Sequence, residues 1–247
     1  MMDQNKSKQF QESEERFRKV FEEGPLGVVL LGLDARIQHC NRRFCEMLDY
    51  SEEEIIALGL AGISHPEDWQ KDFEFGSRLL NSEIPNYTIE KRYVRKGGTV
   101  FWGQLTVPMM HNAEGKPTTI IGMVEDISER KRAEERLGNS ERALRTLIDA
   151  SPESILLMDT EGTVLIANET VARRFGTTVD EIVGQIAYAF VPPEVAANRS
   201  KHVAEVVRTG KPIRFEDRRF EQYVENVVCP VLGERGEVAA VAILGID

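Results

Sequence analysis

The stretch SEERFRKVFEEGPLGVVLLGLDARIQHCNRRFCEML, residues 13–48, has a counterpart at 140–175, SERALRTLIDASPESILLMDTEGTVLIANETVARRF. The two stretches run in step at an offset of 127 (140 − 13), with no gap until at least Ile55 and Ile182. Asn41 meets Asn168 in this register, and apolar residues meet apolar residues where the identities differ. A unit of this length that occurs twice indicates two domains, because the units of solenoid proteins are far shorter.

Length and composition agree with two globular domains. A chain of 247 residues fits two domains of ordinary size, each able to bury its own core. It is 41% hydrophobic and 29% charged, and no apolar run is long enough to cross a bilayer. The N-terminus has no apolar core and is not a signal peptide. We therefore expect a cytoplasmic protein with no membrane insertion within this chain. The net charge of −10 disfavours nucleic-acid binding through a broad basic face.

The cysteines carry no signal of a disulfide framework or of a metal site. Cys40, Cys45 and Cys229 have no metal-ligand spacing, and an odd count argues against a set of disulfides. We expect small, buried or half-buried thiols in a reducing compartment, and no metal site.

The first copy begins with the pattern of a helix. Residues 13–23 place Phe17, Val20 and Phe21 at helical spacing, and Gly24-Pro25 ends the helix.

Two strands and two capped helices are predicted next. Residues 28–31 and 36–40 are strands around a turn, and Asn41 stands where a helix N-cap belongs. Ser51 followed by Glu54 is a capping box that starts another helix.

Each copy closes in three strand-like segments separated by turns. They cover residues 87–95, 100–110 and 118–124 in the first copy, and 213–220, 222–232 and 237–245 in the second. We therefore predict an α+β fold in which each domain is a five-stranded antiparallel sheet with short helices on one face.

This arrangement resembles a tandem of PAS domains of the sensory-box (PAS/PAC) type. The most specific motif is Asp126-Ile127-Ser128-Glu129-Arg130-Lys131, since in this family the last strand leads through such a run into a signalling helix. The second copy reaches the same point at Asp247. The resemblance implies the sensor region of a prokaryotic signalling protein such as a histidine kinase. The predicted parts are an N-terminal tail or helix start (1–12), PAS domain 1 with its PAC motif (13–128), a helical linker (129–139) and PAS domain 2 (140–247).

The stretch between the copies is predicted to be helical. Residues 128–149 contain no proline, and their apolar residues trace one face, as in a short coiled coil: Ala133, Leu137, Leu144, Leu147 and Ile148. A single helix packed on its own domain remains the alternative. The resemblance favours parallel pairing in a homodimer, with the helix passing a shift from one domain to the next.

No catalytic motif occurs in the chain. Nucleophile elbows, Walker sequences and zinc-protease motifs are all absent. The resemblance implies a histidine kinase or diguanylate cyclase as the output partner, but neither output carries its motifs here. We predict no catalytic residues in this chain, and the activity of the whole protein stays open.

Two histidines are candidates for haem. His65, in His-Pro-Glu-Asp-Trp, resembles the position where some oxygen-sensing PAS domains hold haem, although Pro66 and the acids also suit a helix start. His202 lies on a helix predicted over 194–208, in the region that faces the sheet in this family.

A flavin or another small ligand is the further alternative. The light-sensing branch of the family needs Asn-Cys-Arg-Phe-Leu-Gln, and the run from Cys40 to Cys45 departs from it, so a photochemical adduct is not expected. Non-covalent FAD near Trp69 or Trp102 remains open, with core packing as the alternative for Trp102. Arg214 would neutralise a carboxylate in the cleft of the second domain, or point outward from an edge strand.

Three functions stand on this evidence: a sensory and signal-relay module that senses a small molecule, a ligand-free dimerisation scaffold, and a redox or gas sensor that holds haem or FAD. The sequence favours the first and leaves the cofactor, the signal and the output domain open.

Overall fold

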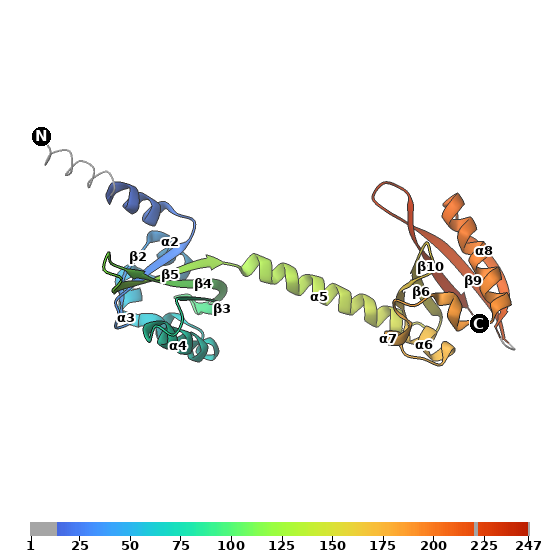
Figure 1. The fold of residues 1–247 in the computed structure, drawn as a ribbon, viewed down its shortest axis with the longest axis horizontal. Helices are drawn as coiled ribbons and strands as arrows, with labels where there is room; N and C mark the ends of the chain where they lie inside the picture. The colour runs from blue at the N-terminus through green and yellow to red at the C-terminus, as the bar shows by residue number, and fades with distance from the viewer. Residues whose placement is uncertain (1–13, 220–221, 247) are drawn as a thin grey trace, which may run out of the picture. The chain divides into compact units, whose positions relative to one another are not determined.

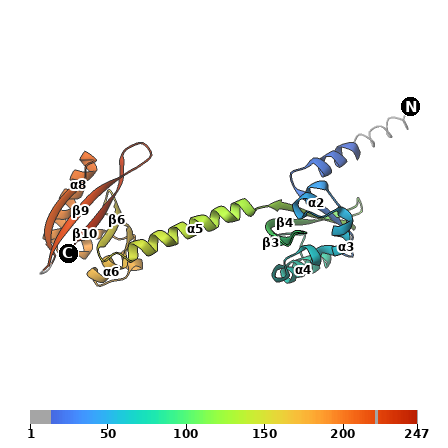
Figure 2. The same ribbon diagram turned by 180° about the vertical axis from the view of Figure 1, so that it is seen from behind.

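A computed structural model describes residues 14–219 and 222–246 of this chain. The chain divides between Arg136 and Leu137 into two compact units, the first and second domains, which are described separately below. Figure 1 labels most of their helices and strands, and Figure 2 shows them from behind.

The first domain contains one five-stranded antiparallel sheet with the strand order β2-β1-β5-β4-β3. Helical residues 14–23 precede it. The other elements are β1 (Gly27–Leu31), β2 (Ile37–Cys40), α2 (Arg42–Leu48), α3 (Glu52–Ile63), α4 (Pro66–Leu80), β3 (Asn86–Val94), β4 (Val100–His111) and β5 (Pro117–Asp126).

The helices α2, α3 and α4 cover one face of this sheet. Phe44 of α2, Ile55 of α3 and Leu79 of α4 belong to the same core as the inward residues of the strands. Along β3 and β4, buried residues alternate with more exposed ones, which is the pattern of a sheet with one covered face.

The second domain repeats this topology, with the strand order β7-β6-β10-β9-β8. Its elements are β6 (Ser154–Asp159), β7 (Val164–Ala167), α6 (Glu169–Phe175), α7 (Val179–Ile182), η1 (Ala187–Phe190), α8 (Pro193–Thr209), β8 (Ile213–Arg219), β9 (Gln222–Leu232) and β10 (Val238–Ile246). The predicted α+β fold with two antiparallel sheets is confirmed.

The predicted helix after the first sheet is also confirmed, as α5 (Ser128–Asp149). Its first turns belong to the first domain and its last turns to the second. The side chains of Leu137, Leu144 and Leu147 are 63%, 57% and 71% exposed. The apolar face of α5 is therefore largely uncovered within the part of the chain that the structure describes.

The helix before β1 differs from its sequence pattern in one respect. Phe21 is buried, but Phe17 and Val20 are exposed, because the last turn of this helix packs on the domain through the stack of Phe21 on His39. The predicted tail and Ser13 lie outside the described residues, as does Phe220 in the predicted strand 213–220.

Candidate functional site

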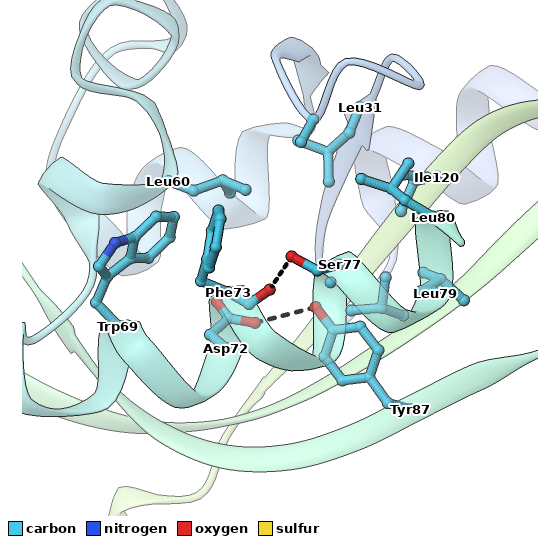
Figure 3. Close-up of a pocket in the computed structure, with 13 residues that line it drawn as sticks. Leu31, Leu60, Trp69, Asp72, Phe73, Ser77, Leu79, Leu80, Tyr87 and Ile120 are labelled. Atoms are coloured by element: carbon cyan, nitrogen blue, oxygen red, sulfur yellow. Dashed lines mark hydrogen bonds between the residues drawn. The ribbon is translucent and has the colours of Figure 1, made fainter. Parts of the chain in front are cut away.

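A small cavity lies between α4 and the sheet of the first domain (Figure 3). Its volume is about 80 Å³. The walls are mostly apolar, and they are formed by Leu31, Ala35, Leu60, Trp69, Asp72, Phe73, Gly76, Ser77, Leu79, Leu80, Tyr87, Val107 and Ile120. This volume is far below the roughly 300–1,000 Å³ that is common for ligand pockets. The cavity therefore suits only a small molecule.

The start of α4 positions this wall of the cavity. His65 is the N-cap, and its Nδ1 accepts a hydrogen bond of 3.3 Å from the backbone N–H of Glu67. Arg92 of β3 donates to both carboxylate oxygens of Asp68, at 2.8 and 2.9 Å. This contact holds the first turn of α4 against β3, and it keeps the pKa of Asp68 below its usual value.

A buried ion pair lies beside the cavity. Asp72 of α4 and Lys91 of β3 are 5% and 2% exposed and form a salt bridge. The Lys91 ammonium also donates to the Ser64 hydroxyl at 2.8 Å, and the Tyr87 hydroxyl donates to Asp72 at 3.0 Å. Each of these charges is therefore paired and hydrogen-bonded, as buried charges must be.

Burial shifts the pKa values of this cluster. Burial, followed by the Asp72 carboxylate, raises the pKa of Tyr87, so its phenol stays a hydrogen-bond donor. Burial lowers the pKa of Lys91, and the Asp72 carboxylate opposes that effect. The arrangement offers a bound molecule an apolar wall with one polar spot, formed by Asp72 and Tyr87.

Trp102 lies away from this cavity. Its neighbour Phe101 points into the core, so Trp102 points to the other face of the sheet. The guanidinium of Arg92 lies 5.5 Å and the ammonium of Lys131 5.3 Å from its ring centre. Trp102 thus packs against two cations next to the start of α5.

His202 and Arg214 belong to the second domain. His202 of α8 stacks on Phe215 of β8, with ring centres 4.0 Å apart, and its Nδ1 lies 2.9 Å from the carbonyl oxygen of Asn198. The side chain of Arg214 is 71% exposed and lies 3.3 Å from Glu225 on the adjacent strand.

The cleft of the second domain is closed by a different arginine. Arg199 of α8 donates to both carboxylate oxygens of Asp217 on β8, at 2.6 and 2.9 Å. Asn226 donates to the same carboxylate at 3.0 Å. The cavity beneath this contact measures about 30 Å³, smaller than the one in the first domain.

The structure does not bring the predicted site residues together. His65 and Trp102 belong to the first domain and His202 and Arg214 to the second, and none of these four residues lines the larger cavity. Trp69, the other tryptophan named for a flavin, does line it. Sequence reasoning missed Asp72, Tyr87 and Lys91. One signal could have found Lys91, since the alternation of β3 places it on the same inward face as Tyr87 and Tyr93.

The size of the cavities is a test of the proposed cofactors. A cavity of about 80 Å³ is too small for haem or FAD. Its polar residue Asp72 is already paired with Lys91 and is not free to bind such a group. Among the described residues there is no group of three or more His, Cys, Asp or Glu side chains that could hold a metal ion. A search of the same residues for an apolar helix long enough to cross a membrane finds none.

Comparison with known families identifies the fold. One family model described as a PAS fold matches residues 37–124, and another with the same description matches residues 148–247. The first range begins at β2 and reaches into β5, and the second spans all five strands of the second sheet. The chain therefore carries two PAS domains in tandem.

Several relatives carry the names of signalling proteins. Probable diguanylate cyclase DgcE of Escherichia coli (strain K12) is 36% identical over 52% of this chain and 12% of its own length. Sensor histidine kinase TmoS of Ectopseudomonas mendocina is 29% identical over 53% of this chain and 14% of its own length. Two-component sensor PprA of Pseudomonas aeruginosa is 25% identical over 82% of this chain and 23% of its own length. The chain thus spans less than a quarter of each of these relatives.

Proposed function

We propose that this chain is the sensory and signal-relay module of a cytoplasmic signalling protein with a kinase or cyclase as its output. The named relatives are a sensor histidine kinase, a two-component sensor and a probable diguanylate cyclase, and they support that output class. The observation that carries the proposal is the position of β3, which contacts the cavity on one side and α5 on the other.

Neighbouring residues of β3 make these two sets of contacts. Lys91 points inward to Asp72, which lines the cavity. Glu90 points outward, where its carboxylate lies 2.8 Å from Arg130 and 2.5 Å from Lys131 in the first turn of α5. A ligand that moves Asp72 would therefore act on β3 and, through Glu90, on α5.

The start of α5 is attached to the sheet by hydrogen bonds as well. The Ser128 hydroxyl accepts from the backbone N–H of Trp102 at 3.1 Å, and the N–H of Ile127 donates to the carbonyl of Trp102 at 2.9 Å. A change in the position of β4 is therefore passed to the helix rather than absorbed by a loose connection.

The last turn of α5 is attached to the second domain. Asn168 donates through Nδ2 to the carbonyl of Ile148 at 3.1 Å, and Asp149 accepts from the backbone N–H of Glu169 at 3.1 Å. Because Asn168 is the N-cap of α6, a shift of α5 acts on the first turn of that helix.

We place the homodimer contact on the exposed apolar face of α5. Leu137, Leu144 and Leu147 would pair with the same residues of a second copy, as in a short parallel coiled coil. The ligand-free dimerisation scaffold remains the second candidate, because this face would serve it equally well.

The test begins with a panel of small, mainly apolar alcohols, phenols and amines, scored by the melting temperature of the purified chain. A ligand should raise the melting temperature of the wild type but not of Gly76→Leu, whose new side chain would occupy the cavity. Far-UV circular dichroism shows whether that variant folds. A protein that responds to nothing favours the scaffold, and a stoichiometric Soret or flavin absorption band would overturn the proposed ligand class.

The relay is tested separately by hydrogen exchange along α5. Ligand binding should change the exchange of residues 128–134 in the wild type, and Glu90→Gln should reduce that change without abolishing binding. Glu83→Gln, on an exposed acid that follows α4, is the matched control. Equal changes in all three proteins would exclude a relay through Glu90.

A further inference from the structure

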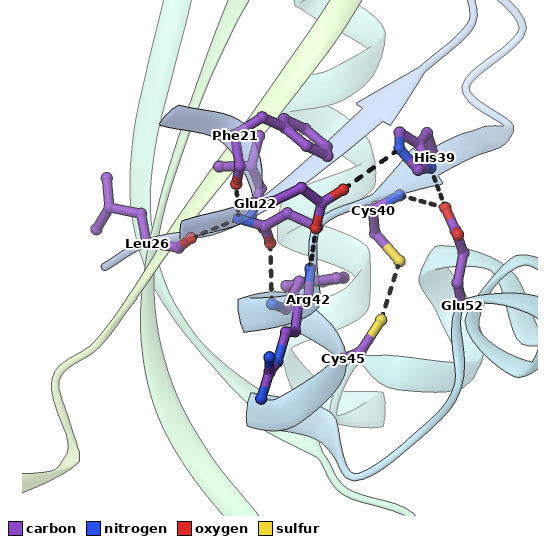
Figure 4. Close-up of polar contacts among 11 residues, drawn as sticks. Phe21, Glu22, Leu26, His39, Cys40, Arg42, Cys45 and Glu52 are labelled. Atoms are coloured by element: carbon purple, nitrogen blue, oxygen red, sulfur yellow. Dashed lines mark hydrogen bonds and ion pairs between the residues drawn. The ribbon is translucent and has the colours of Figure 1, made fainter. Parts of the chain in front are cut away.

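Two of the cysteines lie in contact in the first domain. Cys40 ends β2 and Cys45 lies in α2, and their sulfur atoms are 3.6 Å apart (Figure 4). Cys40 is buried, whereas Cys45 is partly exposed. Cys229 belongs to the second domain, on β9.

The second domain shows that packing does not require sulfur at these places. At the offset of 127, Cys40 corresponds to Ala167 and Cys45 to Ala172. Both alanines are buried, at the end of β7 and in α6. The fold needs only a small side chain at each position, so the paired thiols are a feature of the first domain alone.

We propose that Cys40 and Cys45 are a redox site, at which an oxidised low-molecular-weight thiol such as glutathione disulfide converts the dithiol into a reversible internal disulfide. The Cys45 thiolate, as the more exposed sulfur, attacks the small disulfide, forms a mixed disulfide and releases one small thiol. Cys40 then attacks the Cys45 sulfur and releases the second small thiol. The protein loses two protons and two electrons, and the small disulfide gains them.

The surroundings make this oxidation slow at neutral pH. Burial raises the pKa of both thiols, and the carboxylates of Glu52 on α3 and Glu22 on the first helix raise them further. His39, next to Cys40 on β2, contacts both of these carboxylates. Since the thiolate is the reacting form, the rate should rise with pH.

The disulfide would stiffen the connection between the domain and its first helix. Asn41, which lies between the cysteines in the sequence, donates to the carbonyls of Phe21 at 2.7 Å and Leu26 at 2.9 Å. A cross-link from Cys40 to Cys45 closes a short loop around this residue. Oxidation should therefore raise the melting temperature of the first domain by several degrees.

The experiment treats the reduced chain with glutathione disulfide, blocks free thiols with N-ethylmaleimide, and measures intact mass and tryptic peptides. The wild type should lose two of its three alkylatable thiols together. Because Arg42 and Arg43 lie between the cysteines, trypsin should release a cross-linked pair of peptides rather than one peptide. Dithiothreitol should restore all the thiols.

Two cysteine variants serve as controls for this experiment. Cys229→Ala should form the same cross-link, and Cys40→Ala/Cys45→Ala should fold, because alanines occupy both positions in the second domain. That double variant should show no oxidation-dependent rise in melting temperature. Glutathione left on single cysteines, cross-links between chains through Cys229, or unchanged thiols after treatment at pH 9 would each overturn the proposal.

Discussion

At the scale of single residues, one asparagine organises each domain. The Asn41 side chain accepts hydrogen bonds from the backbone N–H groups of Val28 and Phe44. It donates to the backbone carbonyls of Phe21 and Leu26. Asn168 repeats this arrangement: it accepts from the N–H groups of Ile155 and Val171 and donates to the carbonyls of Ile148 and Glu153. Each asparagine thereby joins a strand, a helix start and the preceding helix.

Replacing Asn168 or Asn41 with alanine should cost at least about 3 kcal/mol of unfolding free energy, since a cap is lost and buried partners are left unpaired. Urea denaturation measures this loss. Asn112→Ala is the control, because that asparagine also accepts backbone hydrogen bonds but lies in an exposed turn. A cost at Asn168 no larger than at Asn112 would contradict the role assigned to it.

The buried ion pair predicts a large, non-additive effect. Lys91→Met should cost about 3–5 kcal/mol, because it leaves the Asp72 carboxylate buried without its cation. Adding Asp72→Asn should recover a substantial part of that loss in a double-mutant cycle. Arg214→Met, which removes an exposed pair with Glu225, should cost less than about 1 kcal/mol. Simple additivity of the two core substitutions would show that these groups do not interact as the structure has them.

At the scale of elements, α4 forms one wall of the cavity and leaves room at Gly76. A Cβ built at this position meets only the Tyr87 hydroxyl, at 3.8 Å, which is ordinary contact. The glycine therefore keeps space open beside the polar spot, although it weakens the helix that carries it.

Gly76→Ala should raise the unfolding free energy by about 0.5–1 kcal/mol, because alanine favours the helix and the added methyl group meets no clash. Gly103→Ala should do the opposite, since its Cβ would lie 2.6 Å from the Tyr93 ring. Thermal and urea unfolding of both variants compare the two sites. A destabilising Gly76→Ala would mean that the cavity is narrower than described.

The exposed face of α5 gives a prediction for assembly. Leu137→Ser with Leu144→Ser should weaken the proposed homodimer, because it removes apolar side chains from the seam. Glu135→Ser with Arg142→Ser is the control, since helical periodicity puts both residues on the opposite side. Sedimentation velocity over a range of concentrations measures the dimer, and a leucine variant that remains fully dimeric would exclude this seam.

At the scale of the whole molecule, acid stability depends on carboxylates whose pKa values are lowered in both domains. Arg92 lowers the pKa of Asp68 in the first domain, and hydrogen bonds from Thr163 lower that of Asp159 in the second. A lowered carboxyl pKa means that the folded state holds fewer protons than the unfolded chain. Its contribution to stability is present above the usual value of 3.8 and is lost as the pH falls through the lower folded value.

We therefore expect stability to fall as the pH is lowered from about 5 to about 2, in both domains. Urea midpoints at several pH values test this expectation. Asp68→Asn should make the unfolding of the first domain less dependent on pH in that range and leave the second domain unchanged. An unchanged slope in the first domain would show that Asp68 is not among the groups responsible.

Much of the fold was predictable because its signals are local. The N-cap at Asn41 and the capping box at Ser51 appear as predicted, and Asn168, the counterpart of Asn41 in the second copy, is also an N-cap. Each of these signals depends on residues a few positions apart. The helix ranges and strand alternation follow from the same short periods. His65 also serves as the N-cap of α4, in agreement with the helix-start reading of His-Pro-Glu-Asp-Trp.

The sequence by itself thus determined two repeated α+β domains, each with a five-stranded antiparallel sheet, and the helix that follows the first sheet, because repetition and local periodicity can be read from the order of the residues. The order of the strands in each sheet came from the tertiary structure. Only the tertiary structure decided that Asp72 meets Lys91, and that Cys40 touches Cys45 where the second domain has alanines. The first contact depends on how α4 packs across β3, and the second on the angle between β2 and α2. Spacing in the sequence specifies neither, because both are set by the shape of the shared core.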